Sequence, residues 1–338
     1  MKPKIMTRRL NSSTYLLGIT ILLLIIMYVS GMIVFGSKGF AKPQMFLNLL
    51  ISNAGLLVIA MGQTIVMIAG GIDISVGSVT ALVCMVTAKQ MEQYGMSAYA
   101  AVGTALLIGL AFGLVQGFLV AYLDIQPFIV TLAGMFFGRG MTSIVSTEMI
   151  SIKNETFLKW ANYKIYLPIG SYSKRGNFLP AYVYPTVIVA LLLMILIILV
   201  MKYTKFGRSV YAIGGNAQSA LMMGLNVRRT KWKAYIVNGL LTGIGGFLFA
   251  LNSCSGFVEQ AKGLEMDAIS SAVIGGTLLS GGIGAPFGTL FGVLIKGTIG
   301  SLITTQGSLS SWWVRITLSA LLCFFIILQS VFSKIKQK

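Results

Sequence analysis

The sequence predicts an all-α polytopic membrane protein with about ten transmembrane helices and with both termini in the cytoplasm. Of its 338 residues, 56% are hydrophobic and only 10% are charged, whereas soluble domains carry about 25% charged residues. Several uncharged stretches are also long enough to cross the hydrocarbon core of a bilayer, which is about 30 Å thick. We therefore treat residues 1–338 as one transmembrane domain and exclude an ordinary soluble fold.

The predicted crossings follow one another along the chain. Five are uncharged: residues 16–35, 46–72, 97–123, 176–201 and 234–258. Three more contain one basic residue each: 128–147 with Arg139, 284–306 with Lys296, and 312–332 with Arg315. Val76–Ala88 and Ala268–Ser280 contain only thirteen residues. Each of these two needs flanking residues, or a broken and tilted path, to cross.

Basic residues mark one side of the membrane. The net charge is +18, and its basic residues gather in the N-terminal segment, in a loop at 204–233 with its flanks, and in the C-terminal tail. The positive-inside rule places such segments in the cytoplasm. Ten crossings put all three on that side, and nine would put the tail outside. This placement favours a topogenic role for the charge, and we expect no nucleic-acid partner. We interpret residues 16–35 as a retained first helix in place of a signal peptide.

The largest segment outside the predicted crossings, residues 148–182, lies on the external side in this topology. It mixes basic, acidic and aromatic residues. Such a composition indicates a folded external flap or an interfacial helix, and it leaves open whether this loop is simply ordered or docks an external partner.

A glycine-rich motif at residues 70–79 interrupts a long apolar run. Its candidate residues, which we assign to a translocation path or a helix break, are Gly70, Gly71, Asp73, Ser75 and Gly77. A carboxylate at membrane depth is costly, so it faces protein or a water-filled cavity. Glycines let the backbone leave helical geometry where the freed amides are satisfied internally. Asp73 either lines a path or caps the following helix, and the sequence leaves both interpretations open.

A similar pattern recurs 205 residues later, with candidate residues Gly275, Gly276, Ser280 and Gly282. Paired glycine-interrupted segments in two halves of a chain are typical of transporters built from internal repeats. Whether this repeat is parallel or inverted is not decided by the sequence.

The basic segment contains one short predicted helix. Asn216 is a good N-cap, the next residues favour a helix, and Gly224 can end it in the left-handed conformation. Two turns are not stable alone, so the helix docks either on its own membrane domain or on a separate cytoplasmic subunit. The candidate coupling residues are Gly215, Asn216, Ala217, Ser219, Ala220 and Gly224.

The residue inventory excludes several kinds of site. The chain has no histidine, and its three cysteines lie in apolar runs, so a His/Cys metal site is not expected. No Gly-x4-Gly-Lys-Ser/Thr nucleotide-binding motif occurs. Paired carboxylates suited to catalysis are also missing, so we expect a transporter subunit and not an enzyme. If ATP drives it, another chain binds the ATP.

Four motifs resemble one known family. They are the residues 70–78, Pro127–Met135, Phe206–Arg208 with Tyr211–Asn216, and Met266–Ile269 leading to Gly275–Gly282. In this order they resemble the permeases of bacterial ATP-binding cassette (ABC) importers for simple sugars of the ribose, xylose and galactose type. Residues 134–140 and 309–313 look most similar to a galactofuranose importer permease.

The resemblance implies a type II importer permease fold in the bacterial cytoplasmic (inner) membrane. It implies a second permease, identical or different, two ATPase subunits that use ATP and Mg²⁺, and an extracytoplasmic sugar-binding protein. This chain would bind no cofactor itself. Residues 216–224 map onto the family region that contacts the ATPase, and the solute would be a monosaccharide. An ATP-independent secondary transporter of a small polar solute is the alternative.

Overall fold

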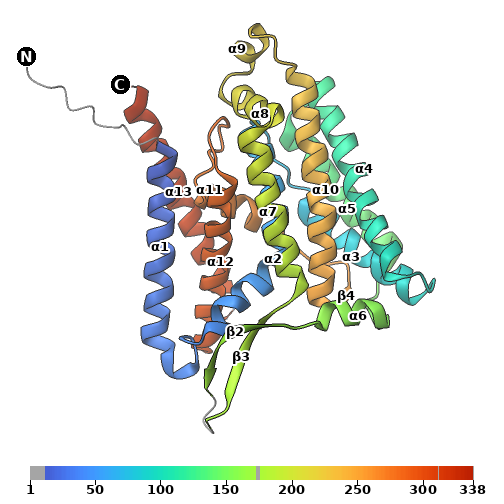
Figure 1. Cartoon of the computed structure of the whole chain (residues 1–338). Coiled ribbons are helices and arrows are strands. Elements are labelled where there is room, and N and C mark those ends of the chain that lie inside the picture. The colour runs from blue at the N-terminus through green and yellow to red at the C-terminus, as the bar shows by residue number, and fades with distance from the viewer. Residues whose placement is uncertain (1–11, 173–175, 311, 338) are drawn as a thin grey trace, which may run out of the picture.

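Eight long helices form the body of the molecule in this computed structural model, which describes residues 12–172, 176–310 and 312–337 (Figure 1). Each of the eight is long and apolar enough to cross a membrane. They are α1 (Ser12–Phe35), α2 (Pro43–Ile68), α4 (Ala98–Tyr122), α5 (Pro127–Val145), α7 (Pro185–Tyr203), α10 (Val227–Ser253), α12 (Pro286–Gln306) and α13 (Trp312–Gln337). A polytopic, mostly helical fold is thus confirmed.

Two crossings are broken and not fully helical. The short helix α3 (Val76–Glu92) has 17 residues, and α11 (Leu264–Ile274) has 11, which correspond to about 26 Å and 16 Å. Non-helical chain at 70–75 leads into α3, and residues 257–263 lead into α11. These two helices fall in the two segments for which the sequence predicted a broken or tilted path, and the number of about ten crossings stays a prediction. The predicted helix at 268–280 is misplaced, because α11 ends at Ile274.

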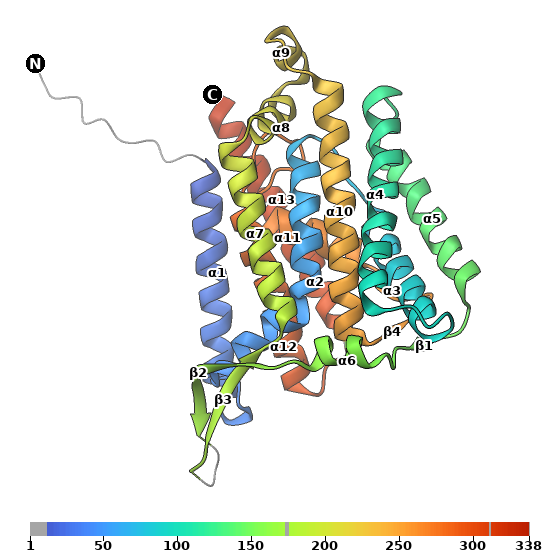
Figure 2. The same cartoon turned by 45° about the vertical axis from the view of Figure 1, so that its right-hand side comes forward.

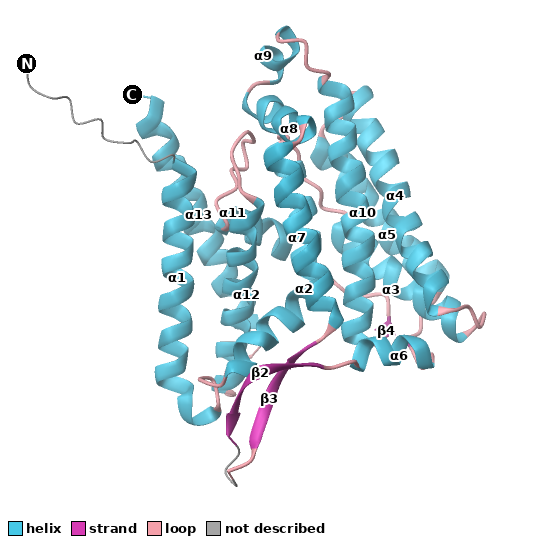
Figure 3. Cartoon of the chain, in the orientation of Figure 1, coloured by secondary structure: helices cyan, strands magenta, loops and turns pink. Residues whose placement is uncertain are grey.

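The two ends of the bundle differ in content. At one end lie α8 (Lys205–Gly215) and α9 (Ala217–Met222), together with the start of α1 and the end of α13 (Figures 1 and 2). We call this the α9 end. The opposite end carries the short helix α6 (Glu155–Asn162) and a hairpin of β2 (Ile165–Tyr172) and β3 (Phe178–Val183), drawn in magenta in Figure 3. We call this the hairpin end.

Several predicted boundaries were wrong. Residues 178–183 form β3, and α7 begins only at Pro185, because proline is favoured in the first turn of a helix. The predicted cytoplasmic loop also ends earlier than expected: α10 begins at Val227, so Arg228, Arg229, Lys231 and Lys233 are helical. A second small sheet pairs β1 (Ile150–Ser151) with β4 (Ser255–Gly256), and η1 (Gly36–Lys38) follows α1.

Glycines allow helices α4 and α10 to pack with their backbones in contact. A Cβ atom on Gly109 would meet the carbonyl oxygen of Gly239, and one on Gly239 would meet that of Gly109. A Cβ atom on Gly113 in α4 would likewise meet the carbonyl oxygen of Tyr235 in α10. Small residues bring membrane helices together in this way, where packing and not water exclusion drives their association.

We expect Gly109→Val to destabilise the protein by about 1–3 kcal/mol, because the added side chain must push α4 away from α10. The measurement is the thermal midpoint of the purified protein in detergent. Gly103→Val is the matched control, since Gly103 is in the same helix and has open space around it. Equal midpoints for the two variants would contradict the packing account.

Candidate functional site

The first glycine motif begins where α2 ends, near the α9 end. Gly70 has a φ of +82°, and the Gly71 amide donates to the carbonyl of Val66 at 2.9 Å, which is the bond pattern of a Schellman helix stop. Gly71 also lies directly against the hydroxyl of Tyr235, where a side chain would not fit. The chain then turns back into the bundle and reaches Ser75, the N-cap of α3.

Asp73 is buried inside the protein, and both oxygens of its carboxylate accept hydrogen bonds there. Its side chain is 5% exposed. One carboxylate oxygen accepts from the Ser75 backbone N–H at 2.8 Å and from the Ser75 hydroxyl at 2.7 Å, and the other accepts from the Asn238 amide at 2.6 Å. With its side-chain amide oriented so that both atoms find partners, Gln63 donates to the Asp73 carbonyl and accepts from the Asp73 backbone N–H. These contacts hold the backbone just before α3.

Side chains from three other helices complete this cluster. The Gln116 amide of α4 bonds the Ser75 hydroxyl, and the carbonyl of Ile72 accepts from the hydroxyls of Thr131 and Tyr235 at 3.4 and 3.3 Å. These partners were not predicted from the sequence. Gln116 and Asn238 do carry a signal, because each is a polar residue within an otherwise apolar crossing.

Gly77 brings the two broken crossings together. A Cβ atom there would strike the Glu265 carboxylate and the Ala261 carbonyl, so the first turn of α3 lies against the first turn of α11. From this meeting point α3 runs toward the hairpin end and α11 toward the α9 end. The two half-crossings therefore point in opposite directions.

The second motif lies at the α9 end, in the loop between α11 and α12. Gly276 has a φ of +93° and therefore corresponds to Gly70. The repeat seen in the sequence had aligned Gly70 with Gly275, so the structural correspondence is shifted by one residue. Gly275 instead contacts the Gly288 backbone at the start of α12. Ser280 is exposed, so it does not share the buried setting of Ser75.

The two motifs and the end of α8 meet at one junction. The Gly282 amide donates to the carbonyl of Ile68, the last residue of α2, at 2.9 Å. Gly214 packs against the same carbonyl, and Gly282 packs against Gly214 and Gly215. We call this three-way backbone contact the glycine junction. It joins the end of α2, the α11–α12 loop and the chain that leads into α9.

The short helix α9 forms as the sequence predicts. The Asn216 side chain accepts from the Ser219 N–H at 2.8 Å, Gly224 has a φ of +80°, and Ala220 is buried against the remainder of the chain. Beyond it the side chains of Leu221, Met222 and Met223 are 60%, 87% and 69% exposed. An isolated helix this short would not be stable, and its Leu221 and Met222 side chains face outward.

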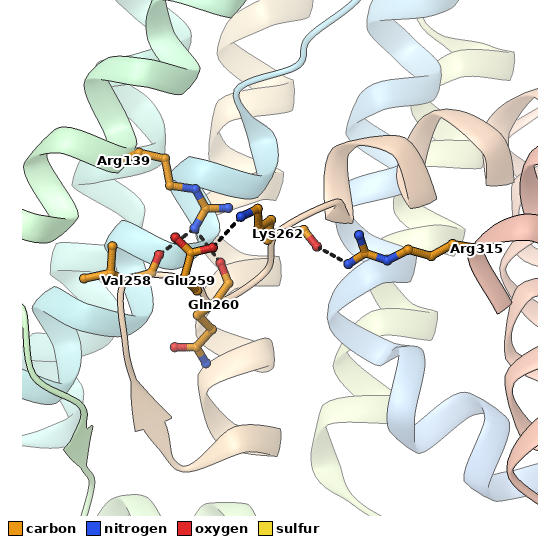
Figure 4. A network of polar contacts seen from close by, with 6 residues as sticks. All are labelled: Arg139, Val258, Glu259, Gln260, Lys262 and Arg315. Atoms are coloured by element: carbon orange, nitrogen blue, oxygen red, sulfur yellow. Dashed lines mark hydrogen bonds and ion pairs between the residues drawn. The ribbon is translucent and has the colours of Figure 1, made fainter. Parts of the chain in front are cut away.

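The three basic residues of the later crossings have distinct partners. Arg139 donates to the carbonyls of Val258 and Gln260 at 2.8 and 2.7 Å. Arg315 approaches from the opposite side and donates to the Lys262 carbonyl at 3.3 Å (Figure 4). Lys296 pairs with Asp267 at 3.2 Å. Arg139 and Arg315 thus hold the non-helical chain that precedes α11.

Within the described residues, no group of three or more acidic or cysteine side chains could hold a metal ion. The fold and these sites define a polytopic membrane protein with broken helices at mid-depth and an exposed helix at one end. These features are typical of a transporter subunit.

Comparison with known proteins identifies the class. The chain belongs to the family described as branched-chain amino acid transport system / permease component, whose model matches residues 45–326. It is 41% identical to the inner membrane ABC transporter permease protein YjfF of Escherichia coli, over 86% of this chain and 85% of that protein. No solved structure matches.

Two further relatives carry a sugar in their names. The chain is 35% identical to the ribose import permease protein RbsC of Bacillus subtilis, over 86% of this chain and 84% of the relative. It is 32% identical to the fructose import permease protein FruG of Bifidobacterium longum, over 91% and 88%. The chain is thus a permease component of an ABC transporter and not an enzyme, and it is a multi-pass inner membrane protein.

We expect Asp73→Ala to destabilise the purified permease by about 1–3 kcal/mol, because it leaves the buried Asn238 amide without an acceptor. Asp73→Asn keeps the acceptor for Ser75. The Asn238 Oδ1 atom has no hydrogen-bond partner, so a flipped Asn238 can accept from the new amide. The thermal midpoint should therefore fall for the alanine variant and be largely retained for asparagine. Equal loss in both would show that the negative charge itself is required.

Proposed function

We propose that this chain is the membrane-spanning permease of an importer that moves a monosaccharide delivered by a substrate-binding protein. The observation that carries the proposal is near-full-length similarity to import permeases named for two monosaccharides, ribose and fructose. Galactofuranose and ribose- or galactose-like sugars are the candidates suggested by the motifs.

The proposed partners are a second permease chain, ABC ATPase subunits and an extracytoplasmic sugar-binding protein. ATP and Mg²⁺ belong to the ATPase, because this chain has no Walker A motif. The exposed apolar side chains of Leu221, Met222 and Met223 support an ATPase contact at α9, since apolar groups that protrude from a surface are typical of a binding site.

The glycine junction connects the proposed ATPase contact at α9 to the membrane-spanning part of the chain. A displacement of α9 acts on Gly215 and Gly214 directly, and these residues touch the end of α2 and the α11–α12 loop. Both broken crossings connect to that junction. Movement of the ATPase subunits would therefore reach the non-helical segments without crossing a flexible linker.

Asp73 acts in this account as a support for the start of α3 and not as the main ligand of the sugar. Its carboxylate has three protein donors, which leaves little capacity for a passing solute. The same bonding argues against an ion-coupled carrier that would use Asp73 as its protonation site.

The test is uptake of radiolabelled D-ribose, D-fructose and D-galactose into proteoliposomes that contain the permease with its partner subunits and binding protein. We expect uptake of at least one sugar only when ATP is inside and the ATPase is present. The control vesicles lack the ATPase but retain the permease. Uptake in these control vesicles, driven by an ion gradient, would contradict the proposal and favour a secondary transporter.

A further inference from the structure

A cavity of about 440 Å³, lined by both polar and apolar side chains, lies among α11, α12 and α13, away from the glycine motifs. Its polar lining residues are Lys262, Asp267, Ser270, Lys296, Arg315 and Ser319. Met266, Val314 and Leu318 supply an apolar wall. None of these residues belongs to the glycine motifs or to the α9 region.

The cavity extends from the hairpin end to the middle of the membrane domain. Arg315 is the fourth residue of α13, which begins at the hairpin end. Lys296 is the eleventh of the 21 residues of α12, so it lies about 15 Å from the end of that helix. A solute that enters from the hairpin end would meet Arg315 first and the Lys296–Asp267 pair at mid-depth.

Charged groups at this depth require water or protein around them. The Lys262 and Glu259 side chains form an ion pair at 2.7 Å, yet they are 68% and 65% exposed. A charged side chain facing lipid is costly, and such residues mark solute pathways or partner contacts. This face of the chain is therefore turned to an aqueous path or to the second permease, and not to lipid.

Two of the three basic side chains that line the cavity form ion pairs, and Arg315 does not, among the residues that the structure describes. Lys262 pairs with Glu259, and Lys296 pairs with Asp267. Arg315 has no ion-pair partner in the described part of the chain; its guanidinium lies 5.2 Å from the Trp312 ring and donates to one carbonyl. A guanidinium has five N–H donors in a planar fork, so several remain for a solute.

We propose that this cavity is a monosaccharide-binding subsite on the import path, with Arg315, Ser270 and Ser319 as hydrogen-bonding residues. Arginine donates to neighbouring ring hydroxyls, and serine hydroxyls both donate and accept. The apolar wall formed by Met266, Val314 and Leu318 suits the C–H face of a sugar ring. The proposal rests on the sugar-import function proposed above, and two of its hydrogen-bonding residues, Arg315 and Ser319, lie outside the four family motifs.

The first experiment tests whether the cavity is hydrated. Ser270→Cys is placed in a background in which the native cysteines are replaced by serine, within the complete importer in intact cells. We expect a membrane-impermeant methanethiosulfonate to label it about tenfold faster or more than Ile26→Cys, because the reactive thiolate forms in water and not in hydrocarbon. Ile26 is an exposed apolar residue of α1. Equal rates would overturn the proposal.

The second experiment tests sugar binding through the kinetics of import. The probe is whichever of labelled D-ribose, D-fructose and D-galactose the wild-type importer takes up with ATP. Arg315→Gln should raise the KM for uptake by about tenfold, and Ser319→Ala by less, because charge-assisted hydrogen bonds are the stronger ones. Thr317→Ala, an exposed position on the same helix, is the control.

The possible failures are distinct. An unchanged KM in Arg315→Gln and Ser319→Ala overturns the subsite and leaves the importer function intact. Saturating amounts of the probe sugar should also slow labelling of Ser270→Cys, and absence of this protection contradicts the subsite even if the variants fold poorly. If the wild-type importer takes up none of the three sugars with ATP, the proposed function itself fails.

Discussion

The glycine junction is the constraint on which the remainder of the structure depends. The carbonyl of Ile68 lies at the end of α2, and it accepts from the Gly282 amide at 2.9 Å while Gly214 packs against it. Three chain segments from distant parts of the sequence meet with backbone against backbone. Any Cβ atom at Gly214 or Gly282 would enter this contact. The junction fixes where α2 stops, and hence where the chain turns back into the membrane domain.

The turn leaves backbone polar groups outside helical hydrogen bonding, and side chains of the neighbouring helices satisfy them. A non-helical backbone at membrane depth is tolerated only where its polar groups are satisfied by protein or water. At residues 72–75 the partners come from α2, α4, α5 and α10, and include Gln63, Thr131, Tyr235 and Asn238. Before α11, Arg139 and Arg315 satisfy the carbonyls from either side. The two breaks are thus stabilised differently, one by a buried carboxylate and the other by arginines.

The sequence predicts local features better than distant contacts. The caps of α9 could be predicted because Asn216 and Gly224 act within a few residues of their partners. The hairpin was missed because residues 176–184 are uncharged and continue directly into α7. The one-residue offset between Gly70 and Gly276 was also missed, since the glycine pattern does not reveal which residue adopts a positive φ. Arg139 finds its carbonyl partners 119 and 121 residues away, and no local pattern indicates such a pairing.

The most direct test of the junction is the number of sugar molecules imported per ATP hydrolysed in reconstituted importers that carry Gly282→Val or Gly307→Val. Both glycines have a positive φ, +74° and +83°, so both substitutions impose similar backbone strain, on the order of 1–3 kcal/mol. Gly282 alone of the two lies in the junction, while Gly307 has open space around it. We predict that Gly282→Val retains ATP hydrolysis but loses most import per ATP, and that Gly307→Val keeps the wild-type ratio. An unchanged ratio in Gly282→Val would contradict the account.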